Sequence, residues 1–234
     1  MKLQGAFLKA RGRFDEAYPY YLEYYERHLQ TRGVDHRETQ VAANNVATLL
    51  KARGLHSSAE EIYQNVLDNR TRVEGTTARM TLNAMNNIAM VKIQIYVTNP
   101  TIEENKTRYI IAFKMLFEAS VSNTMHFPGD SHQLNCAGNL GSMVLTYSTD
   151  VDAAKKGLAL VEQAYNGLTE PPHSLLHSHQ WVVKFRDFIV SGREKLGMPN
   201  IEFPVLVSGS EDTDRETQRE GSQVEHIYTR LRDD

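Results

Sequence analysis

The chain has 234 residues, a formal net charge of −3, and hydrophobic and charged fractions of 41% and 24%, which are ordinary for a globular protein. Nucleic-acid binders carry a basic surface that neutralises phosphates, so this small charge disfavours nucleic acid as a partner. Cys136 is the only cysteine. That excludes an internal disulfide and a cysteine-based zinc site, and it favours a reducing, cytoplasmic compartment. No apolar run reaches the roughly 20 residues that span a bilayer, and the first residues lack the apolar segment of a signal peptide.

A repeat of 42 residues organises the chain. Residues 8–12 (LKARG) are identical to residues 50–54, and the asparagine pair at 44–45 recurs at 86–87. The third unit is longer, so that Asn139 takes the place of Asn87. Because matches this dense at one offset indicate copies of one structural unit, we predict a stacked repeat architecture.

Each unit is predicted to be a hairpin of two helices. Gly12 and Gly54 would end the first helix of their units in the left-handed conformation that glycine adopts without strain. The second helix opens with a small residue that fits where the helices cross closely, and a large residue follows one turn later, as in Ala59 and Tyr63.

Apolar residues within each predicted helix follow helical spacing, as in Ile110, Phe113, Leu116 and Phe117. A single hairpin cannot bury such a face alone, so neighbouring hairpins are expected to supply the core. We therefore predict an all-α solenoid of about four hairpins. The predicted helices span residues 2–11, 14–30, 37–53, 56–72, 78–97, 101–122, 132–147, 151–166 and 174–196.

The ninth predicted helix contains Trp181 and Phe185 but finds no partner in the repeat, so we interpret it as a cap over the last hairpin. After Gly197 the composition becomes polar, with acidic and basic residues interleaved. This change predicts a solenoid with its capping helix over residues 1–197 and an extended or disordered polar tail over residues 198–234. Thr101 with Glu104 forms a candidate capping box for the sixth helix.

The stretch of residues 33–39 (GVDHRET), which leads into the asparagine pair at 44–45, resembles the 42-residue tetratricopeptide repeat of kinesin light chains, as does the segment of residues 59–63 (AEEIY). The resemblance covers residues 1–170 and weakens in the third and fourth units. It implies a tetratricopeptide-type solenoid whose concave groove takes short acidic peptides. The heptad coiled coil of kinesin light chains is missing from this sequence, so we do not extend the resemblance to motor association.

In such a solenoid the first helix of each hairpin lines the concave groove. Asparagine amides there offer two donors and an acceptor to the backbone of an extended peptide, and lysines there can meet carboxylates. The alternative is that the asparagines bond neighbouring backbone and hold the superhelix together, and that the lysines are solvated charges. The candidate peptide-binding residues are Lys9, Asn45, Lys51, Asn83, Asn87, Asn135 and Asn139.

The sequence offers little for catalysis. It contains neither a nucleophile elbow nor a glycine-rich phosphate loop. His173, His177 and His179 lack the His-Glu-x-x-His pattern and are interpreted as polar residues at a helix start. We therefore predict no catalytic residues, no metal site and no cofactor.

Together these features predict a non-catalytic scaffold or adaptor that binds a protein or peptide partner, an extended acidic segment, in its groove. The acidic tail residues Glu211, Asp212 and Asp214 are a candidate intramolecular occupant. The alternative function is a constitutive subunit of a large assembly, held through the end faces of the solenoid and the tail. Met1 falls at about the fourth position of the first repeat helix, so either the chain is a fragment or a partner covers that end.

Overall fold

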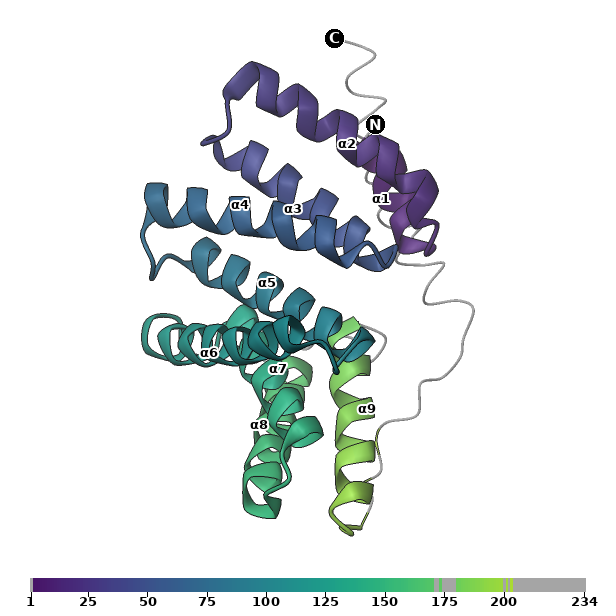
Figure 1. Ribbon diagram of the computed structural model, residues 1–234, viewed down its shortest axis with the longest axis vertical. Helices are drawn as coiled ribbons and strands as arrows, with labels where there is room; N and C mark the ends of the chain where they lie inside the picture. Colours follow the sequence, from purple (N-terminus) through teal and green to yellow (C-terminus); the bar gives the residue numbers. More distant parts are fainter. Residues whose placement is uncertain (1, 171–172, 174–179, 200, 202, 204–234) are drawn as a thin grey trace. The chain divides into compact units, whose positions relative to one another are not determined.

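The computed structural model describes residues 2–170, 173, 180–199, 201 and 203 (Figure 1). The chain divides into two units, residues 1–201 and 202–234. Of the second unit only Phe203 is described, so the predicted tail lies almost entirely outside the described residues. The described part of the first unit is built from α-helices and contains no strand.

Helices form at every predicted position within the described residues. Several of them, α2, α4, α6 and α8, extend beyond their predicted C-terminal ends. Residues 174–179 of the last predicted helix lie outside the described residues. The helices are α1 (Lys2–Ala10), α2 (Phe14–Arg32), α3 (Arg37–Ala52), α4 (His56–Glu74), α5 (Arg79–Thr98), α6 (Glu103–His126), α7 (Ser131–Tyr147), α8 (Val151–Thr169) and α9 (Gln180–Lys195).

The start of α6 differs from its prediction. The helix begins at Glu103 after an N-cap at Ile102, whose side chain cannot accept a capping hydrogen bond. Thr101 lies outside the helix, where its hydroxyl donates to Asn99 Oδ1 at 3.2 Å. The predicted capping box between Thr101 and Glu104 was therefore wrong, because the Thr101 hydroxyl bonds Asn99 in the turn that follows α5 and does not cap α6.

The glycine turns within the first two hairpins form as predicted. Gly12 and Gly54 have φ angles of 71° and 79°. Beyond each glycine, a backbone N–H reaches back to the last turn of the helix: Arg13 N donates to Leu8 O and Leu55 N donates to Leu50 O, both at 2.9 Å. These bonds satisfy carbonyls that the end of a helix would otherwise leave unpaired.

Small residues mark the places where helices cross. Ala17 and Ala59, near the start of α2 and α4, and Ala112, further along α6, are fully buried. One turn after Ala59, the ring of Tyr63 is also buried, and its hydroxyl lies 2.8 Å from the hydroxyl of Thr48 in α3. The pattern of a small residue followed by a large one thus packs the second helix of a hairpin onto the first.

The fourth hairpin is joined more tightly than the others. A Cβ atom added to Gly141 in α7 would lie 2.6 Å from the carbonyl oxygen of Gly157 in α8, so the two backbones touch. In Figure 1, α8 and α9 run side by side and are steeply inclined to α4 and α5. The stack therefore changes direction after the third hairpin.

This change of direction leaves part of α6 uncovered. Leu116 is buried as predicted, whereas Ile110, Phe113 and Phe117 are exposed. The expectation that all four residues contribute to the core was therefore wrong for three of them. Helical spacing identifies an apolar face, but it does not show whether a neighbouring helix covers that face.

The close crossing at Ala59 generates a stability prediction. Ala59→Leu should overpack the junction between α3 and α4 and lower the free energy of unfolding by about 1–3 kcal/mol. Urea denaturation followed by circular dichroism measures the change. The matched control is Ala52→Leu at an exposed position of α3, which should change stability by no more than about 0.5 kcal/mol. Equal midpoints for Ala59→Leu and the wild type would contradict the assignment.

Candidate functional site

A row of side-chain amide bonds connects the first helices of consecutive hairpins. Asn87 Nδ2 in α5 donates to Asn44 Oδ1 in α3 at 3.0 Å. Asn139 Nδ2 in α7 donates to Asn86 Oδ1 in α5 at 2.8 Å. The second asparagine of each pair, or the residue in its place, thus bonds the first asparagine of the preceding hairpin. We call these bonds the amide ladder, and they give Asn87 and Asn139 a structural role.

The predicted asparagines differ in how many hydrogen-bonding groups they have left for a ligand. Asn139 and Asn135 are buried, and Asn139 Oδ1 already accepts from Lys184 Nζ at 2.5 Å. Asn87 is only half-buried, and it keeps its Oδ1 and one N–H free of hydrogen bonds to other described residues. Asn45 and Asn83 are half-buried as well, and they make no hydrogen bond to another described residue. The predicted amides most available to a peptide are therefore Asn45, Asn83 and Asn87.

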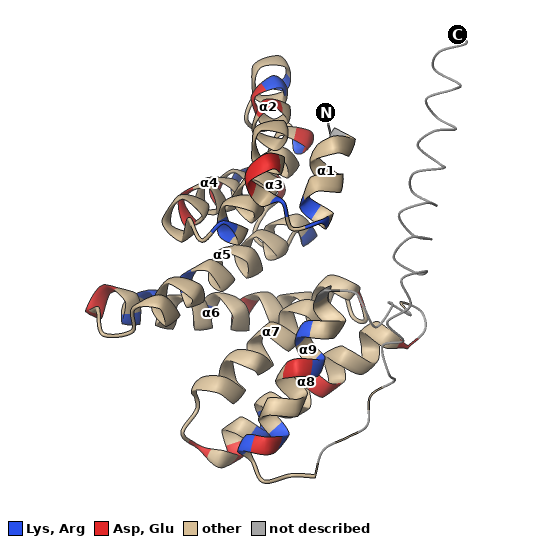
Figure 2. Cartoon of the chain, turned by 90° about the vertical axis from the view of Figure 1, so that its right-hand side faces the viewer, with Lys and Arg blue, Asp and Glu red and all other residues tan. Residues whose placement is uncertain are grey.

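Three lysines from helices far apart in the sequence approach one another. Burial lowers the pKa of Lys9 in α1. Burial, and then the charge of Lys9, lower the pKa of Lys51 in α3. Burial, and then the charge of Lys51, lower the pKa of Lys184 in α9 to about 8. We call these three residues the lysine cluster; the basic residues at the C-terminal end of α1 are visible in blue in Figure 2.

The lysine cluster has no acidic partner among the described residues. Elsewhere in the solenoid the usual pairing holds, since Lys92 Nζ lies 2.5 Å from Glu60 Oε1 and Arg53 Nε lies 2.6 Å from Asp15 Oδ1. Half-buried like charges without a counter-ion repel one another and raise the free energy of the folded state. An anion bound among them would remove that cost.

The position of α9 explains why Lys184 lies close to Lys51. The ring of Trp181 lies 5.8 Å from the ring of His132, near the start of α7. The ring of Phe185 lies against Gly138, in the middle of α7. Lys195 Nζ donates to Leu145 O near the end of α7 at 2.7 Å. Thus α9 runs parallel to α7, where the first helix of a further hairpin would lie, and Lys184 reaches Asn139, the last asparagine of the amide ladder.

Sequence reasoning missed Lys184 because α9 matches no repeat unit. One signal was available, since Lys184 is the single charged residue within the stretch from Trp181 to Phe185. A lysine inside an apolar segment that must pack against a hairpin is buried unless its side chain reaches an edge. Lys9 and Lys51, which were predicted from the repeat, do lie together.

Known structures share this arrangement of helices, although no protein-family model and no curated protein matches the sequence. The kinesin light chain-type protein of Podosopora anserina with nearly identical TPR-like repeats is 13% identical over 97% of this chain and 93% of that chain, with a TM-score of 0.56. BtubC (BKLC) from P. vanneervenii is 16% identical over 88% of this chain and 85% of that chain, with a TM-score of 0.58.

This chain folds as a TPR-like repeat solenoid resembling those of kinesin light chains. At such low identity the likeness concerns the fold, and the groove has to be judged from the residues of this chain. The resemblance stated from the 42-residue repeat is confirmed at that level.

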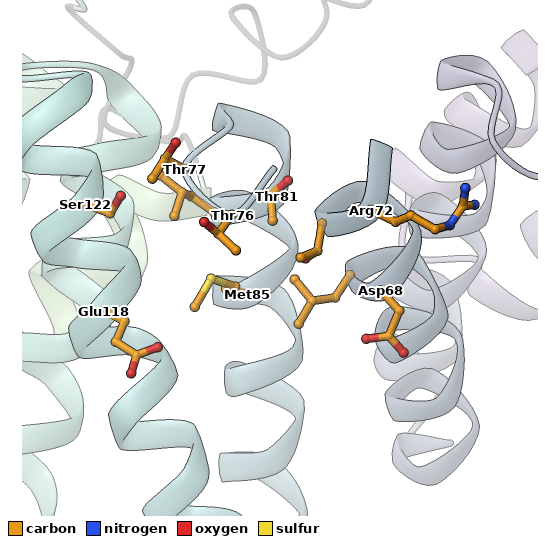
Figure 3. A pocket seen from close by; sticks show the side chains of 11 residues that line it. Asp68, Arg72, Thr76, Thr77, Thr81, Met85, Glu118 and Ser122 are labelled. Atoms are coloured by element: carbon orange, nitrogen blue, oxygen red, sulfur yellow. The ribbon is translucent and has the colours of Figure 1, made fainter. Parts of the chain in front are cut away.

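Two hollows open between successive second helices of the solenoid. The larger, about 560 Å³, lies between α4, α5 and α6, and Figure 3 shows Asp68 and Arg72 on one wall and Glu118 and Ser122 on the other. The smaller, about 390 Å³, lies one repeat earlier between α2, α3 and α4. Both are gaps between diverging hairpins, and neither gathers the paired acids and bases that catalysis requires.

The remaining chemistry of the described residues gives no indication of a metal or nucleophilic site. No group of three histidine, cysteine or acidic residues in the described ranges is placed to hold a metal ion. Burial raises the pKa of Cys136 to about 12, which keeps the thiol protonated. His173 Nε2 lies 2.6 Å from Gly129 O, while His177 and His179 fall outside the described residues. None of the described helices could span a membrane.

The pKa of Lys184 predicts a pH dependence of stability. Because burial lowers this pKa to about 8 from an ordinary 10.5, the charged form is disfavoured in the folded state. The cost is fully present below pH 8 and disappears as the pH rises towards 10.5. Between pH 7.5 and pH 9.5 the wild type should gain on the order of 1 kcal/mol of stability relative to Lys184→Met. Urea denaturation of both proteins at the two pH values checks this, and parallel pH profiles would contradict it.

Proposed function

We propose that this chain is a non-catalytic protein-interaction scaffold that binds an extended, acidic peptide in the groove lined by the first helices of its hairpins. The observation that carries the proposal is the lysine cluster. Lys9, Lys51 and Lys184 approach one another, half-buried, without a carboxylate among the described residues. Carboxylates of a bound peptide would supply the missing counter-charges.

The neighbouring amides support binding of an extended backbone. A peptide strand in the groove exposes N–H and C=O groups that lose water on binding and need partners. Asn45, Asn83 and Asn87 retain donors and acceptors for them. Because amides pair with backbone atoms of any sequence, selection for acidic peptides would come from the lysines. In this proposal the asparagines bind the peptide backbone and the lysines bind its carboxylates.

A second candidate function, a constitutive subunit of a larger assembly, is favoured by a different observation. Leu3 and Phe7 are exposed on α1, which is an end helix of the described stack. Terminal helices of a solenoid usually present a polar outer face. Replacing both residues with glutamate separates the two functions: a peptide-binding scaffold keeps its peptide affinity, whereas a subunit held through this face loses its place in the assembly.

The test of the proposal uses short synthetic peptides in which each position is Asp, Glu, Asn or Gln. Fluorescence anisotropy should show that acidic members bind and that neutral members do not. Lys51→Ala should weaken binding by about two- to fivefold and reduce its dependence on salt. The matched control is Lys156→Ala, an exposed lysine of α8 without an ion-pair partner among the described residues. Equal affinity for acidic and neutral peptides would refute the proposal.

The same assay decides whether Asn87 contacts the peptide or only holds the repeats together. Asn87→Ala removes both the bond to Asn44 and the free groove amide, so affinity should fall by roughly five- to 150-fold. Asn44→Ala removes the same bond of the amide ladder and leaves the Asn87 amide in place. If the two variants lose affinity equally, Asn87 acts through the structure alone.

A further inference from the structure

The outer face of α6 carries a continuous apolar ridge. Its side chains follow one another at intervals of three or four residues, so that they lie on one line along the 24-residue helix. We call this line the α6 ridge. Its members and their exposed fractions are Ile110 (56%), Phe113 (40%), Phe117 (53%), Val121 (43%) and Met125 (73%).

The α6 ridge points away from the core of the solenoid. Ala112, Leu116 and Ala119 are buried on the opposite side of the helix, where α6 meets the rest of the stack. Single exposed apolar residues are common on protein surfaces, but a contiguous line of large ones indicates an interaction site. Because α6 is a second helix of its hairpin, this surface is distinct from the groove and independent of the proposed peptide binding.

The spacing within the α6 ridge is self-complementary. The members are arranged almost symmetrically about Phe117, with Phe113 and Val121 four residues to either side and Ile110 and Met125 at the ends. We propose that the α6 ridge binds the α6 ridge of a second copy of this chain, with the two helices antiparallel and the two Phe117 rings in contact near the two-fold axis. Phe113 then packs against Val121 of the other copy, and Ile110 against Met125, in an isologous interface.

Two charged residues beside the α6 ridge select this orientation. Lys114 and Glu118 are exposed on the same flank of α6, and neither forms an ion pair with another described residue. In an antiparallel pair, equivalent flanks face each other with reversed direction. Lys114 of each copy therefore lies near Glu118 of the other, which gives two reciprocal ion pairs. In a parallel pair the two equivalent flanks would lie on opposite sides of the interface, so neither ion pair would form.

A second copy fits this surface better than an unrelated partner does. The ridge is about 22 Å long at 1.5 Å per residue, so another helix can cover it along its whole length. The hydrophobic pairs and the charge pairs are both satisfied by the same two-fold operation. An unrelated helix would have to match the apolar line and the flanking charges separately.

Exchange of the flanking charges tests the proposal. Sedimentation velocity measures the dimer dissociation constant of the wild type, Lys114→Glu, Glu118→Lys and the double variant with both changes. Each single change places like charges across the interface twice and should weaken the dimer at least about tenfold. The double variant restores both pairs and should dimerise like the wild type. A wild type that remains monomeric up to about 0.1 mM, or a double variant as weak as the single ones, would overturn the proposal.

Two cysteine variants test the geometry. Phe117→Cys should form a disulfide-linked dimer on mild oxidation, because the two substituted positions face each other at the axis. Val73→Cys, at an equally exposed apolar position of α4 outside the ridge, should remain monomeric. The native Cys136 is buried and leaves the result unaffected. Circular dichroism confirms that each variant is folded, and equal cross-linking of both variants would contradict the antiparallel arrangement.

Discussion

The structure depends on one constraint: no helical hairpin of this chain can bury its apolar face by itself. Each hairpin is therefore stabilised by the next, and the contacts that set their mutual register determine everything built on them. Fully buried alanines such as Ala59 and Ala112 allow the helices to cross closely. The amide bonds from Asn87 to Asn44 and from Asn139 to Asn86 then align the first helices of successive hairpins. The proposed groove would depend on these helices being held in line.

The lysine cluster follows from the same stacking. Lys9, Lys51 and Lys184 belong to three helices, and only the arrangement of the hairpins and of α9 brings their charges close enough to influence one another. A fold selected for stability alone would place acidic residues beside them, as it does for Lys92 and Glu60. Uncompensated charge at a half-buried site is the kind of local cost that proteins retain where a ligand will offset it. A dimer formed through the α6 ridge would present two such grooves together, which would raise the avidity for a partner with two acidic segments.

The sequence predicted local features well because the repeat reports them directly. Gly12 and Gly54 adopt the expected left-handed turns, since their role depends on neighbours within a few residues. The asparagine partners could not be read in the same way. Asn87 was expected to contact a peptide or backbone, and its partner proved to be the side chain of Asn44, 43 residues away. Whether it also contacts a peptide remains a prediction.

Two further features required the three-dimensional structure. The exposure of Phe117 follows from how the neighbouring helices are arranged around α6 rather than from anything within α6. Lys184 could not be aligned with Lys9 and Lys51 because its helix has no counterpart in the repeat. In both cases the deciding contact is distant in the sequence, and helical periodicity contains no information about it.

The most direct test of the account is the protonation of the lysine cluster with and without a bound acidic peptide. Nuclear magnetic resonance of lysine side chains labelled with ¹³C measures the pKa of each lysine in the free protein and in the presence of hexaglutamate. Bound carboxylates stabilise the cations, so the account predicts that the pKa of Lys184, about 8 in the free protein, rises together with that of Lys51, while Lys156 does not change. Unchanged pKa values of Lys184 and Lys51 at saturating hexaglutamate would contradict the claim that this cluster is the site for an acidic partner.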